Sequence, residues 1–333
     1  MMSSSRRVYF AAAAVVLPFG LVSCGSQPPS ATEAPAMSSS AEPSGCPTTP
    51  VDVVVSVDQW GDIVSQLGGA CAEVTTVLAG SSVDPHDYEP APSDAARFDG
   101  AQLVVINGGH YDEWAAKLAS ASAPDAPVIS AVGLTGEHHD EGEHGEEGEA
   151  GHEHEHEGNP HVWYDPATVT AVAEAVTSEL GQLAPDASAY FEEQHTKFET
   201  TMKPYYDTIT AIKGAAAGKR YAATESVFDL MGEALGLQNV TPEGYQASSS
   251  NETDPSPADL DAFLRLLGSN GVDVLIYNTQ TEGAITQQIR TAAEQGGVPI
   301  VDVTETVPPG AESFESWQVS QLDALAKALG VEI

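Results

Sequence analysis

Six histidines lie within the segment 136–158, GEHHDEGEHGEEGEAGHEHEHEG, set among ten acidic residues. The segment has no aliphatic or aromatic side chain larger than alanine, so burial cannot offset the entropy lost on folding and we expect a disordered loop. A solvated acidic loop is the simpler reading, but it leaves the histidines unexplained. Neutral imidazole binds zinc, copper, nickel and iron well. We therefore predict an auxiliary metal loop that uses His138, His139, His144, His152, His154 and His156.

Two further histidines lie in turns stiffened by proline. Asp84-Pro-His-Asp-Tyr-Glu-Pro90 holds His86 just after a predicted strand, and Asn159-Pro-His-Val-Trp-Tyr-Asp-Pro166 holds His161 at a predicted helix start. A stray surface histidine and a simple helix-entry turn are the structural alternatives. Two imidazoles held at fixed positions are candidate ligands for a transition-metal ion.

Acidic side chains follow two strands of the second half of the chain. Glu225 lies between a predicted strand and a predicted helix, where the helix dipole alone would also favour it. Asp302 and Glu305 belong to the last strand and its end, and either side chain is able to face a cleft; a solvated acid is the alternative for both. Two imidazoles and two carboxylates together make a closed site for a divalent ion.

The elements that must position these side chains alternate between strand and helix. Short β-branched runs separated by helical periodicity predict parallel sheets, and the same plan occurs twice along the chain. We predict an α/β fold of two similar βα lobes, joined by a long, rigid helix with helical spacing over 187–213, and a metal cleft between the lobes. Ligands of open α/β sheets lie beyond the carboxyl ends of the strands. The predicted boundaries are 51–185 for the first lobe, 186–215 for the connecting helix and 216–333 for the second lobe.

The first residues read as an export signal. Arg6 and Arg7 precede an apolar stretch that is too short to span a bilayer, and the stretch ends in Leu21-Val22-Ser23-Cys24. This resembles a bacterial lipobox, although an ordinary signal peptide with an incidental cysteine is the alternative. We expect a signal peptide over 1–23 and a lipidated Cys24 with a flexible tether over 24–50. The Sec and Tat export routes both stay open, and the mature protein is expected on the extracytoplasmic face of the cell membrane.

Two cysteines remain besides Cys24, namely Cys46 and Cys71. An even pair in an oxidising compartment predicts a disulfide, with two free thiols as the alternative. The bond would join the end of the tether to the first lobe.

The formal net charge is −37, from 49 acidic and 12 basic residues. Nucleic acids and anionic surfaces require basic patches, so this charge argues against them and favours cations as partners. The chain also lacks a His-Glu-x-x-His, a Gly-x-Ser-x-Gly and a Walker A motif. We therefore do not expect an enzyme.

Over about residues 51–333 the sequence resembles the zinc- and manganese-specific solute-binding lipoproteins of bacterial ABC importers. The segments that carry the resemblance are DPHDYEP, VVING, NPHVWYDP, ATESVFDLMGEALGL and, more weakly, VPIVDVTETVPPGAESFESW. The resemblance implies two α/β lobes linked by a long helix, with the metal between them. It implies His86, His161, Glu225 and Glu305 as ligands, and it favours Glu305 over Asp302. The implied partners are an importer permease and its ATPase.

Glu225 departs from the zinc members that the chain resembles, which commonly have histidine at this position. Two carboxylates favour a harder ion such as Mn²⁺, whereas the His-rich loop points to Zn²⁺, which also accepts His₂ plus carboxylates. We expect Zn²⁺ as the bound ion, with Mn²⁺ as the alternative. A surface adhesin or a passive metal buffer is the remaining alternative for function, and His110, after a predicted strand, is a further candidate contact.

Overall fold

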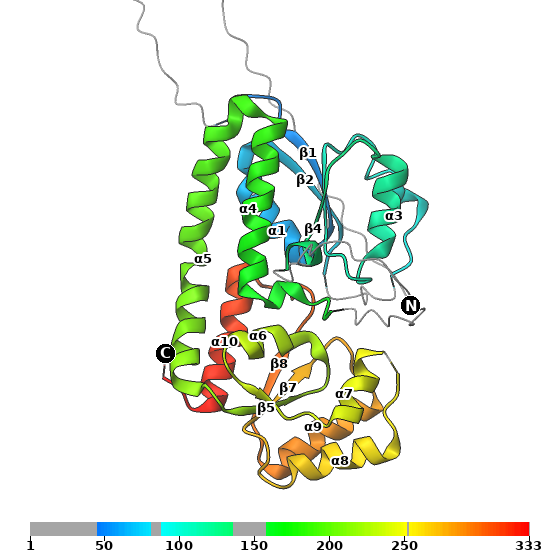
Figure 1. Cartoon of the computed structure of the whole chain (residues 1–333), viewed down its shortest axis with the longest axis vertical. Helices are drawn as coiled ribbons and strands as arrows, with labels where there is room; N and C mark the ends of the chain where they lie inside the picture. Colours follow the sequence, from blue (N-terminus) through cyan, green and yellow to red (C-terminus); the bar gives the residue numbers. More distant parts are fainter. Residues whose placement is uncertain (1–44, 81–87, 136–157, 252, 333) are drawn as a thin grey trace, which may run out of the picture. The chain divides into compact units, whose positions relative to one another are not determined.

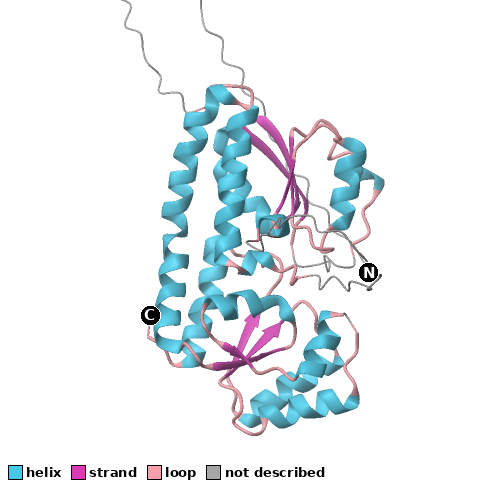
Figure 2. Ribbon diagram, in the orientation of Figure 1, coloured by secondary structure: helices cyan, strands magenta, loops and turns pink. Residues whose placement is uncertain are grey.

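Two four-stranded parallel sheets organise the part of the chain that the computed structural model describes, which is residues 45–80, 88–135, 158–251 and 253–332 (Figures 1 and 2). The first sheet has the order β2-β1-β3-β4 and the second has the order β6-β5-β7-β8. In both sheets the first and third strands of the lobe lie in the centre, and the second and fourth strands lie at the edges. The predicted fold class of two similar α/β lobes is confirmed.

The two central strands of the first lobe are buried on both faces. Its strands are β1 (Val51–Val57), β2 (Ala72–Leu78), β3 (Leu103–Ile106) and β4 (Val128–Ser130). β1 and β3 are almost continuous runs of buried aliphatic residues, as expected of parallel strands covered by helices. The helices of this half are α1 (Asp58–Gly68), α2 (Pro92–Ala95), α3 (Glu113–Ser122) and α4 (Pro166–Leu183).

The second lobe repeats the plan with shorter strands. Its strands are β5 (Arg220–Ala223), β6 (Gln238–Asn239), β7 (Val274–Asn278) and β8 (Ile300–Val303). Its helices are α6 (Asp229–Ala234), α7 (Glu243–Ser250), α8 (Pro257–Leu267), α9 (Ala284–Gly296) and α10 (Phe314–Leu329). The helix predicted to follow Glu225 begins instead as a 3-10 turn, Ser226–Phe228, which is followed by α6. Glu225 is thereby left in extended backbone just before the turn.

The helix α5 (Ser188–Ala216) runs for 29 residues through Pro204. Figure 1 shows it lying along α4, and it also packs against α1 and α10. Its buried residues repeat at helical spacing: Phe191, Phe198, Met202, Tyr205, Ile209, Ile212 and Ala216. The stripe buries one face of the helix against elements of both lobes. This agrees with the helix predicted over 187–213.

One apolar core continues from the first lobe into the second. Val274 and Ile276 of β7 belong to the same buried cluster as β1, β3 and α5. Leu275 and Tyr277 alternate with them and pack in a separate cluster with α8 and α9. The period of two along a strand sends successive side chains to opposite faces of the sheet, so the inner face of the second sheet packs into the shared core.

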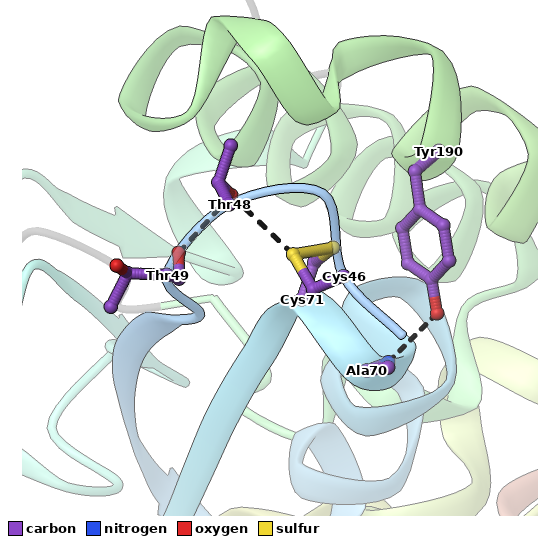
Figure 3. Close-up of a disulfide and its surroundings, with 6 residues drawn as sticks. All are labelled: Cys46, Thr48, Thr49, Ala70, Cys71 and Tyr190. Carbon is purple, nitrogen blue, oxygen red and sulfur yellow. Dashed lines mark hydrogen bonds between the residues drawn. A yellow bond between two sulfur atoms is a disulfide. The ribbon is translucent and has the colours of Figure 1, made fainter. Parts of the chain in front are cut away.

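A disulfide joins Cys46 to Cys71, as predicted (Figure 3). Cys71 closes a 3-10 turn, Gly69–Cys71, directly before β2. The backbone N–H of Ala70 in this turn donates to the hydroxyl of Tyr190 on α5 at 2.8 Å. The disulfide therefore fixes the start of the described chain at the amino end of the β2 strand.

No helix in the described parts of the chain is both long and apolar enough to cross a membrane. The predicted signal peptide over 1–23 and the lipidated Cys24 lie outside the described residues, as does most of the tether predicted over 24–50.

Candidate metal centre

A cavity of about 900 Å³ opens where several strands end. It is lined by the turn that holds His161, by Glu225 after β5 and by Glu305 after β8. These positions follow the carboxyl ends of parallel strands or enter a helix, which is where ligands of α/β sheets gather. Acidic side chains recur in its wall: Glu225, Asp229, Glu233, Asp254 and Glu305. Among the described residues that line it there is no lysine or arginine, so the wall favours a cation.

His161 is held in one tautomer by Asn159. The Asn159 Oδ1 accepts the backbone N–H of His161 at 3.0 Å and lies 2.7 Å from His161 Nδ1. Asn159 Nδ2 donates to the carbonyl of Ser226 at 2.7 Å, which fixes the orientation of the amide. An amide oxygen only accepts, so Nδ1 carries the proton and Nε2 carries the lone pair that binds metals.

The ring of His161 is packed among aromatic side chains that exclude water. Trp163 lies edge-on at 5.3 Å between ring centroids and Tyr111 at 6.0 Å. The side chain of His161 is only 7% exposed. Asn107 supports the turn, because its Nδ2 donates to the carbonyl of Pro160 at 2.8 Å.

Glu305 belongs to the second lobe and is 2% exposed. Its Oε2 lies 3.9 Å from His161 Nε2 of the first lobe. At the tetrahedral angle, two donors that bind one Zn²⁺ at about 2.0–2.2 Å lie roughly 3.3–3.6 Å apart, so a shared ion requires these two atoms to approach by only a few tenths of an ångström. The backbone is held from both sides: Gln280 Oε1 accepts the N–H of Glu305 at 2.6 Å, and Gln59 Nε2 of α1 donates to its carbonyl at 2.8 Å.

Glu225 is joined to Glu305 through Asn278 at the end of β7. Asn278 Nδ2 donates to Glu225 Oε2 at 2.5 Å and to Glu305 Oε1 at 2.7 Å. One buried amide therefore brings the two carboxylates to the same place. Charge-assisted hydrogen bonds of this kind are short and orient the acceptor well.

The tyrosines around the site stay neutral. Burial, followed by the nearby charge of Glu305, raises the pKa of Tyr111 well above its ordinary value. Burial likewise raises the pKa of Tyr245, and the charge of Glu225 adds to the effect. These hydroxyls therefore add no negative charge to the site, and its ionic donors are the carboxylates.

The structure brings His161, Glu225 and Glu305 together at the cavity but does not do so with two other candidates. Asp302 points away from it, because its Oδ1 lies 2.6 Å from Arg290 Nη1 of α9 and half of its side chain is exposed. His110 lies in a left-handed turn with its side chain exposed beside Glu113, and it is not among the described residues of the cavity wall.

His86 and the six histidines of the acidic loop lie outside the described residues. Within the described part of the chain, no three His, Cys, Asp or Glu side chains by themselves form a group that could hold a metal ion. The described residues thus supply candidate donors from both lobes, and the remaining candidate, His86, belongs to the segment 81–87.

Four supporting residues were not predicted from the sequence, namely Gln59, Asn159, Asn278 and Gln280. Asn159 had a sequence signal, since it stands two residues before His161 in a proline-stiffened turn and asparagine favours such turns. Asn278 is a polar residue at the end of a fully buried strand, which is also a usable signal. No signal in the sequence pointed to the role of Gln59, because its partner Glu305 is 246 residues away.

A family model described as zinc-uptake complex component A, periplasmic, matches residues 53–328. A zinc-binding lipoprotein AdcA of Streptococcus pneumoniae is 25% identical over 285 residues, which are 81% of this chain and 54% of that protein. The high-affinity zinc uptake system protein ZnuA of Bacillus subtilis is 26% identical over 203 residues, which are 60% of this chain and 62% of that protein. The chain therefore spans little more than half the length of these curated relatives.

Solved structures share the fold at low sequence identity. The solute-binding protein FpvC of Pseudomonas aeruginosa with Ni²⁺ has a TM-score of 0.64 and 20% identity, over 86% of this chain and all of that one. An Mn-bound periplasmic metal-binding protein from Candidatus Liberibacter asiaticus has a TM-score of 0.67 and 16% identity, over 84% of this chain and 99% of that one.

Proposed function

This chain belongs to the family of the periplasmic zinc-uptake complex component A, and from that premise we propose that it captures Zn²⁺ outside the cytoplasm for an ABC importer. The permease and its ATPase are the proposed partners, and the ion is cargo. The family is one of transporter components and not of enzymes, which agrees with a site built for binding. The permease would receive the ion from the cavity between the two lobes.

The observation that carries the proposal is the meeting of His161 Nε2 and Glu305 Oε2 at 3.9 Å across the two lobes. Each donor is buried and its backbone is held by hydrogen bonds, so little order is lost when an ion binds. Glu225 reaches the same place through Asn278. The proposed ligands are His161, Glu225 and Glu305 with His86, a donor set of two imidazoles and two carboxylates that Zn²⁺ accepts in four-coordinate sites.

The proposal gives the remaining predicted segments supporting roles. Lipidation at Cys24 would keep the protein on the extracytoplasmic face of the membrane, near its permease. The six histidines of the loop would bind Zn²⁺ weakly and raise its local concentration at the cavity. The strongly acidic composition adds a long-range attraction for cations.

A competitive titration tests the function directly. The metal-stripped protein without its signal peptide and lipid is titrated with Zn²⁺ and Mn²⁺, alongside a loop deletion (136–157) and Glu225→Ala. We expect one tight Zn²⁺ site that survives the loop deletion and weakens at least tenfold in Glu225→Ala.

Other results would reject parts of the proposal. Tight Mn²⁺ binding that Zn²⁺ does not displace would make the protein a manganese carrier. Binding confined to the loop would leave a buffer or an adhesin and reject the cavity as the site.

A further inference from the structure

Asn278 stands between the two candidate carboxylate ligands. It is the last residue of β7 and is completely buried. Its single Nδ2 group donates to one oxygen of Glu225 and to one oxygen of Glu305, at 2.5 and 2.7 Å. Because an amide nitrogen has two hydrogens, both of its donors are used on these two acids.

The orientation of this amide is fixed by the chain around it. Asn278 Oδ1 accepts the backbone N–H of Gln280 at 3.0 Å, and the backbone N–H of Asn278 donates to Thr224 Oγ1 at 3.1 Å. A flipped amide would place its oxygen against two carboxylate oxygens and its NH₂ against a backbone N–H. Both arrangements are repulsive, so the NH₂ group faces the acids.

A carboxylate that gives one oxygen to a short amide hydrogen bond approaches a metal most readily through its other oxygen. In bidentate binding, Glu225 Oε2 or Glu305 Oε1 would share its electron density between the ion and the Asn278 amide, which weakens its bond to the ion. Monodentate carboxylates keep the number of donors low, which suits four-coordinate Zn²⁺. Mn²⁺ prefers octahedral sites rich in oxygen and gains most from carboxylates that bind through both oxygens.

We propose that Asn278 determines the selectivity of the site for Zn²⁺ over Mn²⁺, by holding Glu225 and Glu305 in monodentate geometry. It does not touch the ion; it is a positioning residue that acts through the two acids. This inference rests on the proposed function and goes beyond it, since it assigns the choice between two ions to a residue that is not a ligand.

The test compares Asn278→Ala and Asn278→Ser with a matched control, Asn239→Ala. Asn239 ends β6 and also bonds a backbone N–H two residues on, that of Thr241, and donates to a carboxylate, that of Asp229. Asn239 is exposed and does not line the cavity of about 900 Å³. The control thus removes the same kind of contact from a strand end whose asparagine, among the described residues, bonds Asp229 and neither Glu225 nor Glu305.

Zn²⁺ and Mn²⁺ affinities are measured by competition, and X-ray absorption on each metal-loaded protein counts the nitrogen and oxygen ligands. We expect both Asn278 variants to lose about tenfold or more of the ratio of Zn²⁺ to Mn²⁺ affinity. Their Mn²⁺ complexes gain one or two oxygen ligands over the wild type. Asn239→Ala keeps the wild-type ratio and ligand count.

Equal weakening of both ions with an unchanged ligand count would reduce Asn278 to a structural role and overturn the inference. If the Asn278 variants do not fold, the ligand count of the wild-type Zn²⁺ complex still tests the proposal. Four ligands with monodentate carboxylates support it. Bidentate carboxylates contradict it. A wild type that binds neither ion would overturn the proposed function itself, which is a different result.

Discussion

Asn159 Oδ1 lies 2.7 Å from His161 Nδ1, and the same asparagine donates through Nδ2 to the carbonyl of Ser226 next to Glu225. One side chain therefore sets the tautomer of a candidate ligand from the first lobe and ties its turn to a candidate ligand segment of the second. Hydrogen-bond partners of this kind orient metal-binding histidines and raise their basicity.

Asn159→Ala is expected to weaken Zn²⁺ binding by about 10–100-fold, because His161 loses its orienting acceptor. Asn159→Asp keeps an oxygen opposite Nδ1 and should recover much of that loss. Competition against a chelator of known affinity measures both variants. Equal losses in the two variants would contradict the orienting role, because only the alanine removes the acceptor.

Glu305→Gln and Asp302→Asn separate the two acids of the last strand. The first change removes a buried charge that lies 3.9 Å from His161 Nε2, so we expect Zn²⁺ affinity to fall by at least tenfold. The second change affects an exposed side chain that pairs with Arg290, so Zn²⁺ affinity should stay within about twofold. Calorimetric titration of metal-stripped protein distinguishes the variants. The reverse order of effects would place the acidic ligand at position 302.

Removal of the disulfide by the double change Cys46→Ser and Cys71→Ser should lower stability without altering the metal site. The cysteines are 25 residues apart, and a loop of this length predicts a loss of about 3 kcal/mol in the free energy of unfolding. The melting temperature should fall by roughly 6–12 °C. The bond lies at the amino end of β2, whereas the cavity lies at carboxyl ends of strands, so Zn²⁺ stoichiometry is the internal control. A changed stoichiometry would show coupling that the fold does not predict.

The pair Arg220–Asp273 gives a stability that depends on pH. Hydrogen bonds from the Arg220 side chain, and then from its backbone N–H, lower the pKa of Asp273 below its ordinary value. The unfolded state then binds the proton more tightly, so the contribution is present above about pH 4 and is lost as pH falls through the folded pKa.

Asp273→Asn should therefore cost about 0.5–1 kcal/mol at pH 7, a small value because both side chains are about a third exposed. The difference from the wild type should shrink toward zero near pH 2. Urea unfolding at a series of pH values measures it. Asp261→Asn, which removes an exposed helix pair with Arg265, is the control and should give a smaller effect at every pH. A difference that persists at pH 2 would show that charge is not its cause.

The sequence alone determined the class of fold. Five of the seven residues of Val51–Val57 are valine, which a strand buried on both faces explains, and the long apolar stripe of α5 required a partner along its whole length. These are local signals that neighbouring residues carry. Helix α7 shows the limit, because its sequence EGYQASSS buries little besides Tyr245 and has no clear apolar period.

The sequence also supplied the chemistry of the site: His161, Glu225 and an acid after the last strand stand at predicted ends of elements. It left Asp302 and Glu305 as alternatives, since both are acids of the same segment. Only the tertiary structure placed Asp302 beside Arg290 and Glu305 beside His161.

The same is true of Asn278, whose two acidic partners are 53 and 27 residues away. Pairings at such separations depend on how strands order within a sheet and how two sheets share one core. No short window of sequence contains that information, because a side chain's partners across a fold are decided by packing and not by its neighbours in the chain.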